Sequence, residues 1–192
     1  KGFFKFFSSG ETGDAISFVQ KVENLDFQEA LEFLSQRFGI PLRYESGGAS
    51  QSFVKSIRAE LHAVNEEAKK WFMKQLKLET NESKVAWQYW IEERKFSAQT
   101  AIEFGIGYAP TDEFALAEHL ILQNFSKEIM SKSGLFREKL RQGKLVSSFQ
   151  GRLMIPIHEK LGRICGFTAR KLAATPEWGE KKAPKYINSP ET

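Results

Sequence analysis

The residues best suited to chemistry gather near the C-terminal end of the sequence. Residues 149–192 carry five cations on or beside an expected pair of strands: Arg152, Arg163, Arg170, Lys171 and Lys185. Arginine can clamp a phosphate with two parallel hydrogen bonds, and lysine adds a point charge. Tyr186 could stack on a base, and Asn188 could bond to a base edge or a sugar. These residue types favour a nucleotide or nucleic-acid surface, and an ordinary solvated basic face is the alternative.

The distribution of charge supports an anionic partner for this end of the chain. The 192 residues have a formal net charge of only +4. Residues 134–192 contain 12 lysines and arginines against 5 acidic residues, a net of +7, whereas residues 1–133 contain 16 against 19, a net of −3. A local excess of positive charge is what a phosphate-binding surface requires.

The stretch FFKFFSSGETGD, residues 3–14, resembles a zinc knuckle without its ligands. A Cys-x-x-Cys knuckle sets two thiolates on a Gly-rich turn between two strands, and the corresponding positions here are Phe6 and Ser9. Phenylalanine has no lone pair to offer, and a serine hydroxyl is a poor zinc ligand. We therefore expect a metal-free hairpin.

The other residues that could support catalysis or bind a metal are scattered. His62, His119 and His158 lie far apart in the sequence, and each is expected on a surface or a helix face rather than at a metal. Cys165, the only cysteine, is expected to pack in an apolar strand. No Asp-x-Asp pair is present to hold two Mg²⁺ ions as in a polymerase, so we expect no catalytic residue on this chain.

Composition narrows the class of protein. Hydrophobic residues make up 41% and charged residues 27%, which is ordinary for a soluble globular protein. The sequence has no run of 18 apolar residues, so we expect neither a membrane span nor a membrane partner. A single cysteine and the lack of a visible signal peptide fit the cytoplasm. The chain opens with lysine rather than methionine, which is typical of a fragment.

The sequence predicts an α+β fold that begins with a small module of a hairpin and two helices. Asp14 is expected to cap a helix that starts at Ala15, and a second helix is expected from Phe27 until Gly39 ends it. Residues 46–52 have the small, polar composition of a linker.

Helices are expected next, and strands last. Helical periodicity extends over residues 53–78 and 82–93, and over 98–104 with Ser97 as the cap. Two shorter helical segments follow, and Gly134 ends the second of them. An antiparallel β region follows, with strands over 152–157 and 163–168 joined by a turn at 159–162. Pro156 within the first of these strands indicates a sheet edge or a bend.

Two segments of the basic end are specific enough to indicate a family. The sequence RLMIPIHEKLGRICGFTARKL, followed by PKYINSPET, resembles the start of the RNA polymerase domain of bacterial DnaG-type DNA primases. The upstream WIEERKFSAQTAIEFGIGYAP is similar to a helical signature of the same domain, and residues 3–40 resemble the second half of that family's zinc-binding module. The resemblance covers essentially the whole chain.

The departures from the family pattern also have consequences. The family has Cys-Phe-Gly-Cys where residues 6–9 are FFSS, so both ligands of that knuckle, at Phe6 and Ser9, are lost. The family's Gly-Phe-Gly-Gly-Arg is GFTAR at residues 166–170, which keeps Arg170 and loses two glycines that would let a ligand approach the backbone.

The resemblance implies a domain organisation. Residues 1–45 would be the remnant of a zinc-binding-type module, 46–52 a linker, and 53–192 the N-terminal subdomain of the RNA polymerase domain. The family's Zn²⁺ belongs to an intact N-terminal module, and its Mg²⁺ belongs to a Toprim fold that would follow Thr192. No cofactor is therefore expected on this chain.

The resemblance also implies a function. Such a protein is part of a DNA primase, a nucleotidyltransferase that synthesises short RNA primers on single-stranded DNA at the replication fork in the cytoplasm. Its partners would be single-stranded DNA, NTPs, the RNA primer and, through a further domain, the replicative helicase. This chain alone is expected to be inactive. The alternative is a non-catalytic single-stranded DNA-binding or interaction protein derived from a primase.

Residue roles follow by carrying the family's motifs onto this sequence. The resemblance implies that four residues line the groove for template and incoming nucleotide: Arg152, Arg170, Lys185 and Asn188. Three neighbours would add charge and stacking: Arg163, Lys171 and Tyr186.

Overall fold

The computed structural model describes residues 2–23, 25–42, 57–139, 143–159, 162–177 and 179–190. The chain separates into two compact units, Lys1–Phe53 and Val54–Thr192. The expected linker at 46–52 and the start of the expected helix at 53–56 lie outside the described residues. The two units are treated below one at a time.

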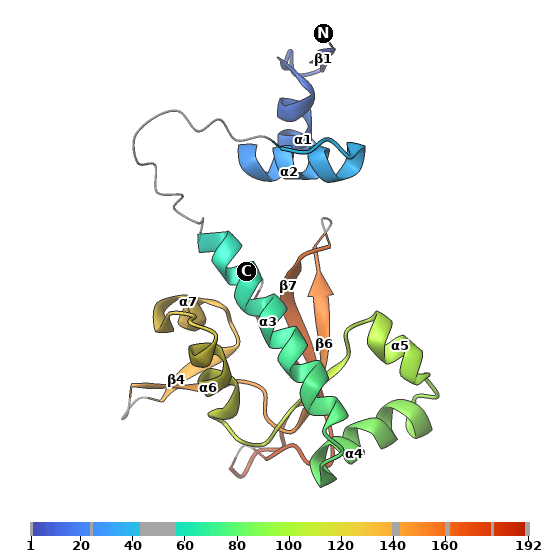
Figure 1. The fold of residues 1–192 in the computed structure, drawn as a ribbon, viewed down its shortest axis with the longest axis vertical. Helices are drawn as coiled ribbons and strands as arrows, with labels where there is room; N and C mark the ends of the chain where they lie inside the picture. Colours follow the sequence, from blue (N-terminus) through green and yellow to red (C-terminus); the bar gives the residue numbers. More distant parts are fainter. Residues whose placement is uncertain are drawn as a thin grey trace. The chain divides into compact units, whose positions relative to one another are not determined.

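The N-terminal unit is a two-stranded hairpin followed by two helices (Figure 1). Strands β1 (Phe4–Lys5) and β2 (Thr12–Gly13) pair antiparallel. Helix α1 (Ala15–Glu23) begins after Asp14, whose carboxylate accepts from the backbone N–H of Ser17 at 2.8 Å. Helix α2 (Phe27–Phe38) ends at Gly39 in the left-handed conformation, as its sequence predicts.

A capping box stabilises the start of α2. The Asp26 carboxylate accepts from the N–H of Glu29 at 2.8 Å, and the Glu29 carboxylate accepts from the N–H of Asp26 at 2.9 Å. Two of the N–H groups that a helix start leaves without partners are satisfied in this way.

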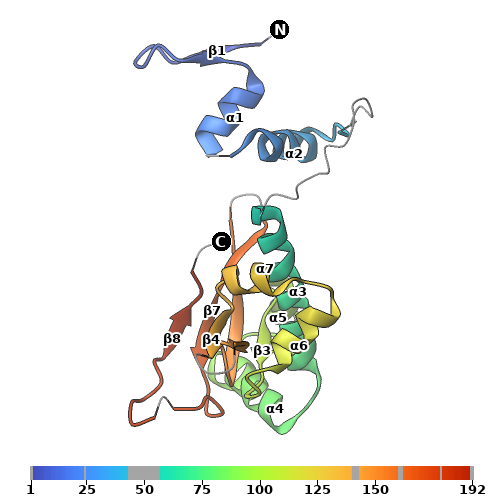
Figure 2. The same cartoon turned by 90° about the vertical axis from the view of Figure 1, so that its left-hand side faces the viewer.

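The C-terminal unit is built on a four-stranded antiparallel sheet of order β3-β6-β7-β8. Its strands are β3 (Gly107–Ala109), β6 (Arg152–His158), β7 (Ile164–Lys171) and β8 (Tyr186–Asn188). The hairpin of β6 and β7 forms its centre, and Figure 2 shows β8 running beside β7. This antiparallel region, after a mainly helical segment, confirms the predicted fold class.

The long helix α3 (Ile57–Lys77) runs along one face of the β6–β7 hairpin (Figure 1). Its Phe72 side chain packs edge-on against Phe167 of β7, with ring centroids 5.5 Å apart. A Cβ atom on Gly107 would lie only 2.5 Å from the Cβ of Phe72, so only glycine lets β3 approach the helix this closely. The main hydrophobic core lies between α3 and this face of the sheet.

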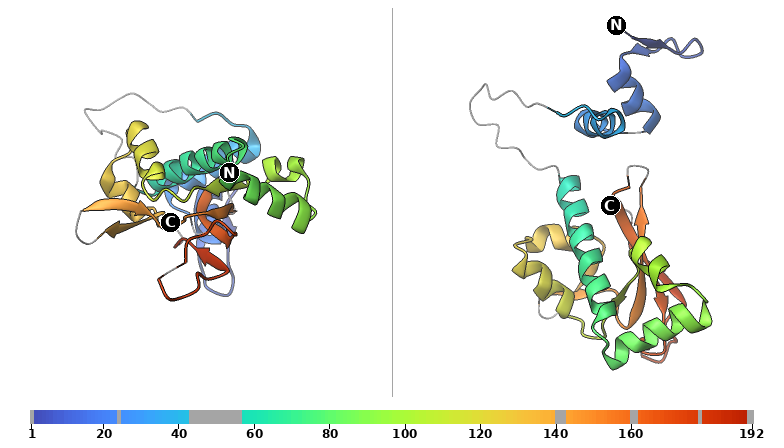
Figure 3. Two further views of the ribbon diagram at one scale, coloured as in Figure 1. Left: turned by 90° about the horizontal axis from the view of Figure 1, so that it is seen from below. Right: turned by 45° about the vertical axis from the view of Figure 1, so that its right-hand side comes forward.

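Two groups of short elements flank α3, as Figure 3 shows from two directions. On one side lie α4 (Asn81–Gln88), the π-helix η1 (Tyr89–Glu93) and α5 (Ala98–Glu103). On the other lie α6 (Ala115–Leu122), α7 (Lys127–Lys132) and the hairpin of β4 (Phe136–Lys139) with β5 (Lys144–Ser147). No helix among the described residues combines the length and apolar character needed to cross a membrane.

The sheet departs from the sequence prediction at Pro156. The sequence predicted either a sheet edge or a bend there, and the edge is wrong because β6 is an inner strand. Strand β3, however, pairs only with Arg152, Leu153 and Met154, and the register of β6 shifts after Ile157. Pro156 therefore lies past the end of β3, where its missing N–H does not interrupt that pairing.

Candidate nucleic-acid interface

Strand register brings three of the predicted residues to one face of the sheet. Arg170 of β7 lies opposite Tyr186 of β8, and Thr168 lies opposite Asn188. Because side chains alternate along a strand, Arg170, Tyr186 and Asn188 point to the same side. Tyr186 is 49% exposed. We call this region, with Tyr89 and Lys185, the tyrosine end of the β6–β7 hairpin.

The guanidinium of Arg170 is held by aromatic and carbonyl groups. Its Nε donates to the Tyr89 hydroxyl at 3.0 Å, and its Nη1 donates to the carbonyl of Lys185 at 3.4 Å. It also lies over two aromatic rings, 5.1 Å from the centroid of Tyr89 and 5.2 Å from that of Tyr186. Among the described residues Arg170 has no ion pair. Its positive charge is therefore positioned without being neutralised.

Lys185 immediately precedes β8, and its side chain is exposed. Its carbonyl is fixed to the sheet, because it accepts from the N–H of Lys171 at 2.8 Å as well as from Arg170. The backbone at Lys185 is thus held in place while the ammonium group reaches solvent. An exposed lysine on a fixed backbone suits a phosphate contact.

Arg152 does not lie on the surface, which corrects the expectation that it directly lines a groove. It is only 1% exposed, and its Nη1 donates to the carbonyls of Ala169 at 3.3 Å and Pro184 at 3.1 Å. Burial, and secondly the charge of Arg170, lower the pKa of Arg152 from its ordinary value, although Glu177 acts in the opposite direction. The buried guanidinium attaches the segment before Lys185 to the sheet.

Lys171 is partly buried and paired within the chain. Its ammonium group forms an ion pair with Glu177, whose carboxylate also accepts from the N–H of Ala183. The bond from Lys171, then that from Ala183, hold the pKa of Glu177 below its ordinary value. Lys171 therefore helps to fold the loop between β7 and β8 back on itself.

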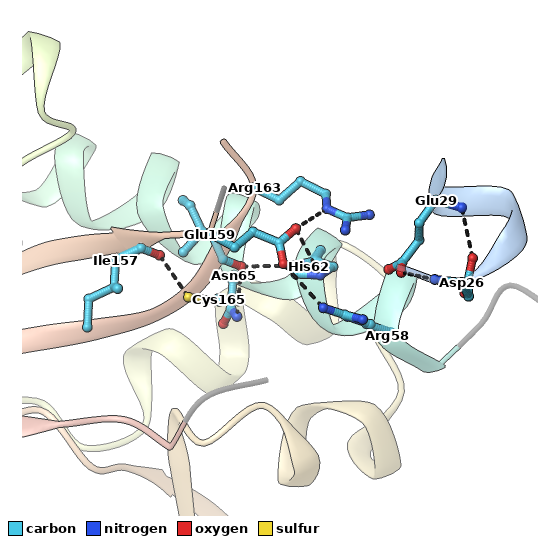
Figure 4. Close-up of polar contacts among 10 residues, drawn as sticks. Asp26, Glu29, Arg58, His62, Asn65, Ile157, Glu159, Arg163 and Cys165 are labelled. Atoms are coloured by element: carbon cyan, nitrogen blue, oxygen red, sulfur yellow. Dashed lines mark hydrogen bonds and ion pairs between the residues drawn. The ribbon is translucent and has the colours of Figure 1, made fainter. Parts of the chain in front are cut away.

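Arg163 lies at the other end of β7 and is not brought together with the tyrosine end. It directly precedes β7 and is seven positions from Arg170, a separation of about 23 Å for extended backbone. Its guanidinium binds the carboxylate of Glu159, which also accepts from Arg58 at 3.3 Å (Figure 4). We call Arg58, His62, Glu159 and Arg163 the carboxylate end of the hairpin.

His62 belongs to this second cluster and is more buried than the sequence indicates. It is 5% exposed, and its Nδ1 lies 2.9 Å from the carbonyl oxygen of Ile164. Its Nε2 lies 3.9 Å from the Glu159 carboxylate (Figure 4). His119 lies instead 3.0 Å from the Glu67 carboxylate. Cys165 is buried, as predicted, with its Sγ 3.5 Å from the Ile157 carbonyl oxygen.

Tyr89 is the functional candidate that the sequence analysis missed. It is 9% exposed and belongs to the π-helix η1, whose widened turn is closed by a bond from the N–H of Arg94 to the carbonyl of Tyr89 at 3.0 Å. Its partner Arg170 is 81 positions away, so no local pattern links them. The only local indication is the π-helix itself, a rare element that often marks functional sites.

The N-terminal hairpin does not fit a zinc ion at the two knuckle positions. Phe6 packs against Phe4 with ring centroids 5.1 Å apart, and Phe18 of α1 lies 5.3 Å from Phe4 and 6.2 Å from Phe6. An aromatic cluster thus occupies the position where one thiolate would stand. Within the described parts of the chain, no group of three or more His, Cys, Asp or Glu side chains could hold a metal ion.

Two family models match the chain. The DNA primase catalytic core, N-terminal domain, matches residues 71–192, and the CHC2 zinc finger matches residues 1–52. The DNA primase of Streptomyces coelicolor is 38% identical over 192 residues, which cover 100% of this chain and 28% of that protein. The chain therefore belongs to the DNA primase family, and it spans little more than a quarter of the length of its curated relatives.

Solved structures agree with this assignment. The RNA polymerase domain of Mycobacterium tuberculosis primase DnaG, solved with a double-stranded DNA oligomer with a 6-nucleotide overhang, is 35% identical with a TM-score of 0.62, covering 70% of this chain and 39% of that chain. A DnaG primase catalytic domain bound to single-stranded DNA is 28% identical with a TM-score of 0.55, covering 71% of this chain and 39% of that chain.

Proposed function

We propose that this chain is the template- and nucleotide-binding part of a primase that synthesises short RNA primers on single-stranded DNA. The observation that carries the proposal is the tyrosine end, where Arg170 and Lys185 present charges on a fixed backbone beside the exposed ring of Tyr186. Membership of the primase family, together with relatives solved with DNA, supports it.

The residues of the tyrosine end take different roles in this proposal. Arg170 and Lys185 bind phosphates, Tyr186 stacks on a base, and Asn188 bonds to a base edge or a sugar. Arg152 acts from the interior by holding the Pro184 carbonyl. Arg163 takes no direct part, since its charge is paired with Glu159.

The domain and cofactor assignments belong to the same proposal. Residues 1–45 form a zinc-finger-type module that binds no zinc at Phe6 and Ser9, and residues 53–192 form the N-terminal subdomain of the RNA polymerase domain. Elemental analysis of the purified chain should then find no stoichiometric zinc. One tightly held zinc per chain would refute this assignment. In this proposal the chain takes part in primer synthesis, with NTPs and Mg²⁺, only when the chain is joined to a Toprim fold.

Binding of a labelled single-stranded oligonucleotide to the 192-residue chain tests the proposed function. The double variant Arg170→Ala/Lys185→Ala should bind at least about tenfold more weakly, and its log–log salt slope should be smaller by about 1.4, or 0.7 for each lost phosphate contact. The control variant Lys74→Ala/Lys84→Ala removes two exposed charges from helices α3 and α4. Equal effects of the two double variants would refute an interface at the tyrosine end.

A further inference from the structure

We infer that Tyr89 is a positioning residue that sets the orientation of Arg170 for nucleic-acid binding. The inference rests on the proposed function and adds a residue to it. Tyr89 is nearly buried, so it is not expected to contact a nucleic acid directly. It reaches the interface only through its contacts with the guanidinium of Arg170.

The contacts between Tyr89 and Arg170 restrict two motions of the arginine. The hydrogen bond from Nε to the hydroxyl fixes one edge of the planar guanidinium. The ring face of Tyr89, 5.1 Å from the guanidinium carbon, limits its tilt. Nη1 donates to Lys185, and Nη2 is the guanidinium nitrogen left for a phosphate. An arginine that is already oriented loses less side-chain entropy when it binds.

The fold keeps Tyr89 in place from both sides. The widened turn of η1 begins at this residue, and the next residue, Trp90, is 6% exposed and donates from its indole Nε1 to the carbonyl of Ser97 at 3.0 Å. Besides the main core, the C-terminal unit has a smaller hydrophobic cluster that contains Tyr89, Tyr108 and Leu153, and Leu153 is the strand partner of Arg170. The ring of Tyr89 is therefore packed, and the hydroxyl that accepts the hydrogen bond from Nε is held in a fixed position.

Graded substitutions separate the two contacts of Tyr89. Tyr89→Phe keeps the ring and removes the acceptor, whereas Tyr89→Leu removes both. We expect single-stranded DNA binding to weaken about threefold for the first and about tenfold for the second, because a net hydrogen bond and a cation–π contact each contribute modestly. The salt slope should also fall by up to about 0.7, although no charge has been removed.

The matched control is Tyr108→Phe. Tyr108 belongs to the same hydrophobic cluster, and its hydroxyl donates to Glu82 at 3.2 Å rather than contacting Arg170. Both Phe variants remove one largely buried hydroxyl, so a general loss of stability would affect them alike. Only Tyr89→Phe should change the salt slope.

A double-mutant cycle distinguishes failure of this inference from failure of the proposed function. In an Arg170→Ala background, Tyr89→Phe should have no further effect on binding. If Arg170→Ala weakens binding but Tyr89→Phe and Tyr89→Leu do not, or if their effects add fully to it, the inference alone is overturned. If Arg170→Ala leaves binding unchanged, the proposed interface is wrong and the inference falls with it.

Discussion

The two ends of the β6–β7 hairpin carry similar cations in opposite environments. At the carboxylate end, Arg163 and Arg58 both bind Glu159, so that the two guanidinium groups share one carboxylate within the fold (Figure 4). At the tyrosine end, Arg170 is held by a hydroxyl, a carbonyl and two rings, which orient its charge without cancelling it. A count of basic residues cannot separate these cases, because the difference lies in their partners.

Two glycines at opposite ends of the hairpin give the largest expected contrast in stability. Gly151 and Gly162 both have positive φ, of 60° and 77°. A Cβ on Gly151 would collide with the backbone of Ala174 in the loop after β7, whereas one on Gly162 would meet nothing within 4 Å. We expect Gly151→Ala to lower the free energy of unfolding by about 2–4 kcal/mol, by steric overlap added to backbone strain.

The matched variant Gly162→Ala should lower the free energy of unfolding by only about 1 kcal/mol, which is the strain of an alanine in the left-handed conformation. Urea denaturation of both variants measures the difference. Equal losses would mean that the loop after β7 moves away freely, and that the tyrosine end is not held as tightly as its hydrogen bonds indicate.

The carboxylate end should contribute to stability and not to binding. Glu159→Gln weakens two arginine contacts at a carboxylate that is only 15% exposed, so we expect a loss of about 1–2 kcal/mol in unfolding free energy. The comparison variant Glu128→Gln interrupts an exposed pair with Lys132 and should leave the free energy of unfolding nearly unchanged. Oligonucleotide affinity should be unchanged in both variants. Tighter binding by Glu159→Gln would show that a released Arg163 can contact phosphate.

A smaller effect concerns pH at the loop that precedes Lys185. The pKa of Glu177 lies below its ordinary value of 4.5, through its bonds from Lys171 and Ala183. A carboxylate with a lowered pKa stabilises the folded loop above pH 4.5, and that contribution disappears as the pH falls through the lowered value. The NMR shift of the Ala183 amide should therefore titrate with a midpoint below 4.5. A midpoint at or above 4.5 would show that these bonds do not form in solution.

Sequence patterns predicted those elements whose signals are local. Asp14, Ser97 and Gly39 mark helix ends by capping, and periodicity locates the helices between them. The pattern missed β3 and β8, each three residues long, because so short a strand shows no alternation. It also missed the β4–β5 hairpin, whose sequence is rich in charged residues.

The candidate site was predictable in its residue types but not in its geometry. The family resemblance implied that Arg152 lines a groove, whereas in the structure it is buried and its Nη1 donates to carbonyl groups distant in sequence. The separation of Arg163 from Arg170 follows from their positions at opposite ends of β7. The role of Tyr89 depends on a contact across 81 positions, which a single sequence does not reveal.

The central claim is that the two ends of β7 differ in what their arginines can bind. The most direct test compares Arg163→Ala with Arg170→Ala, two variants of equal charge at opposite ends of β7, by the salt dependence of single-stranded oligonucleotide binding. The account predicts that Arg170→Ala lowers the log–log slope by about 0.7 and that Arg163→Ala leaves it unchanged. Equal slopes for the two variants, whether both reduced or both unchanged, would contradict it.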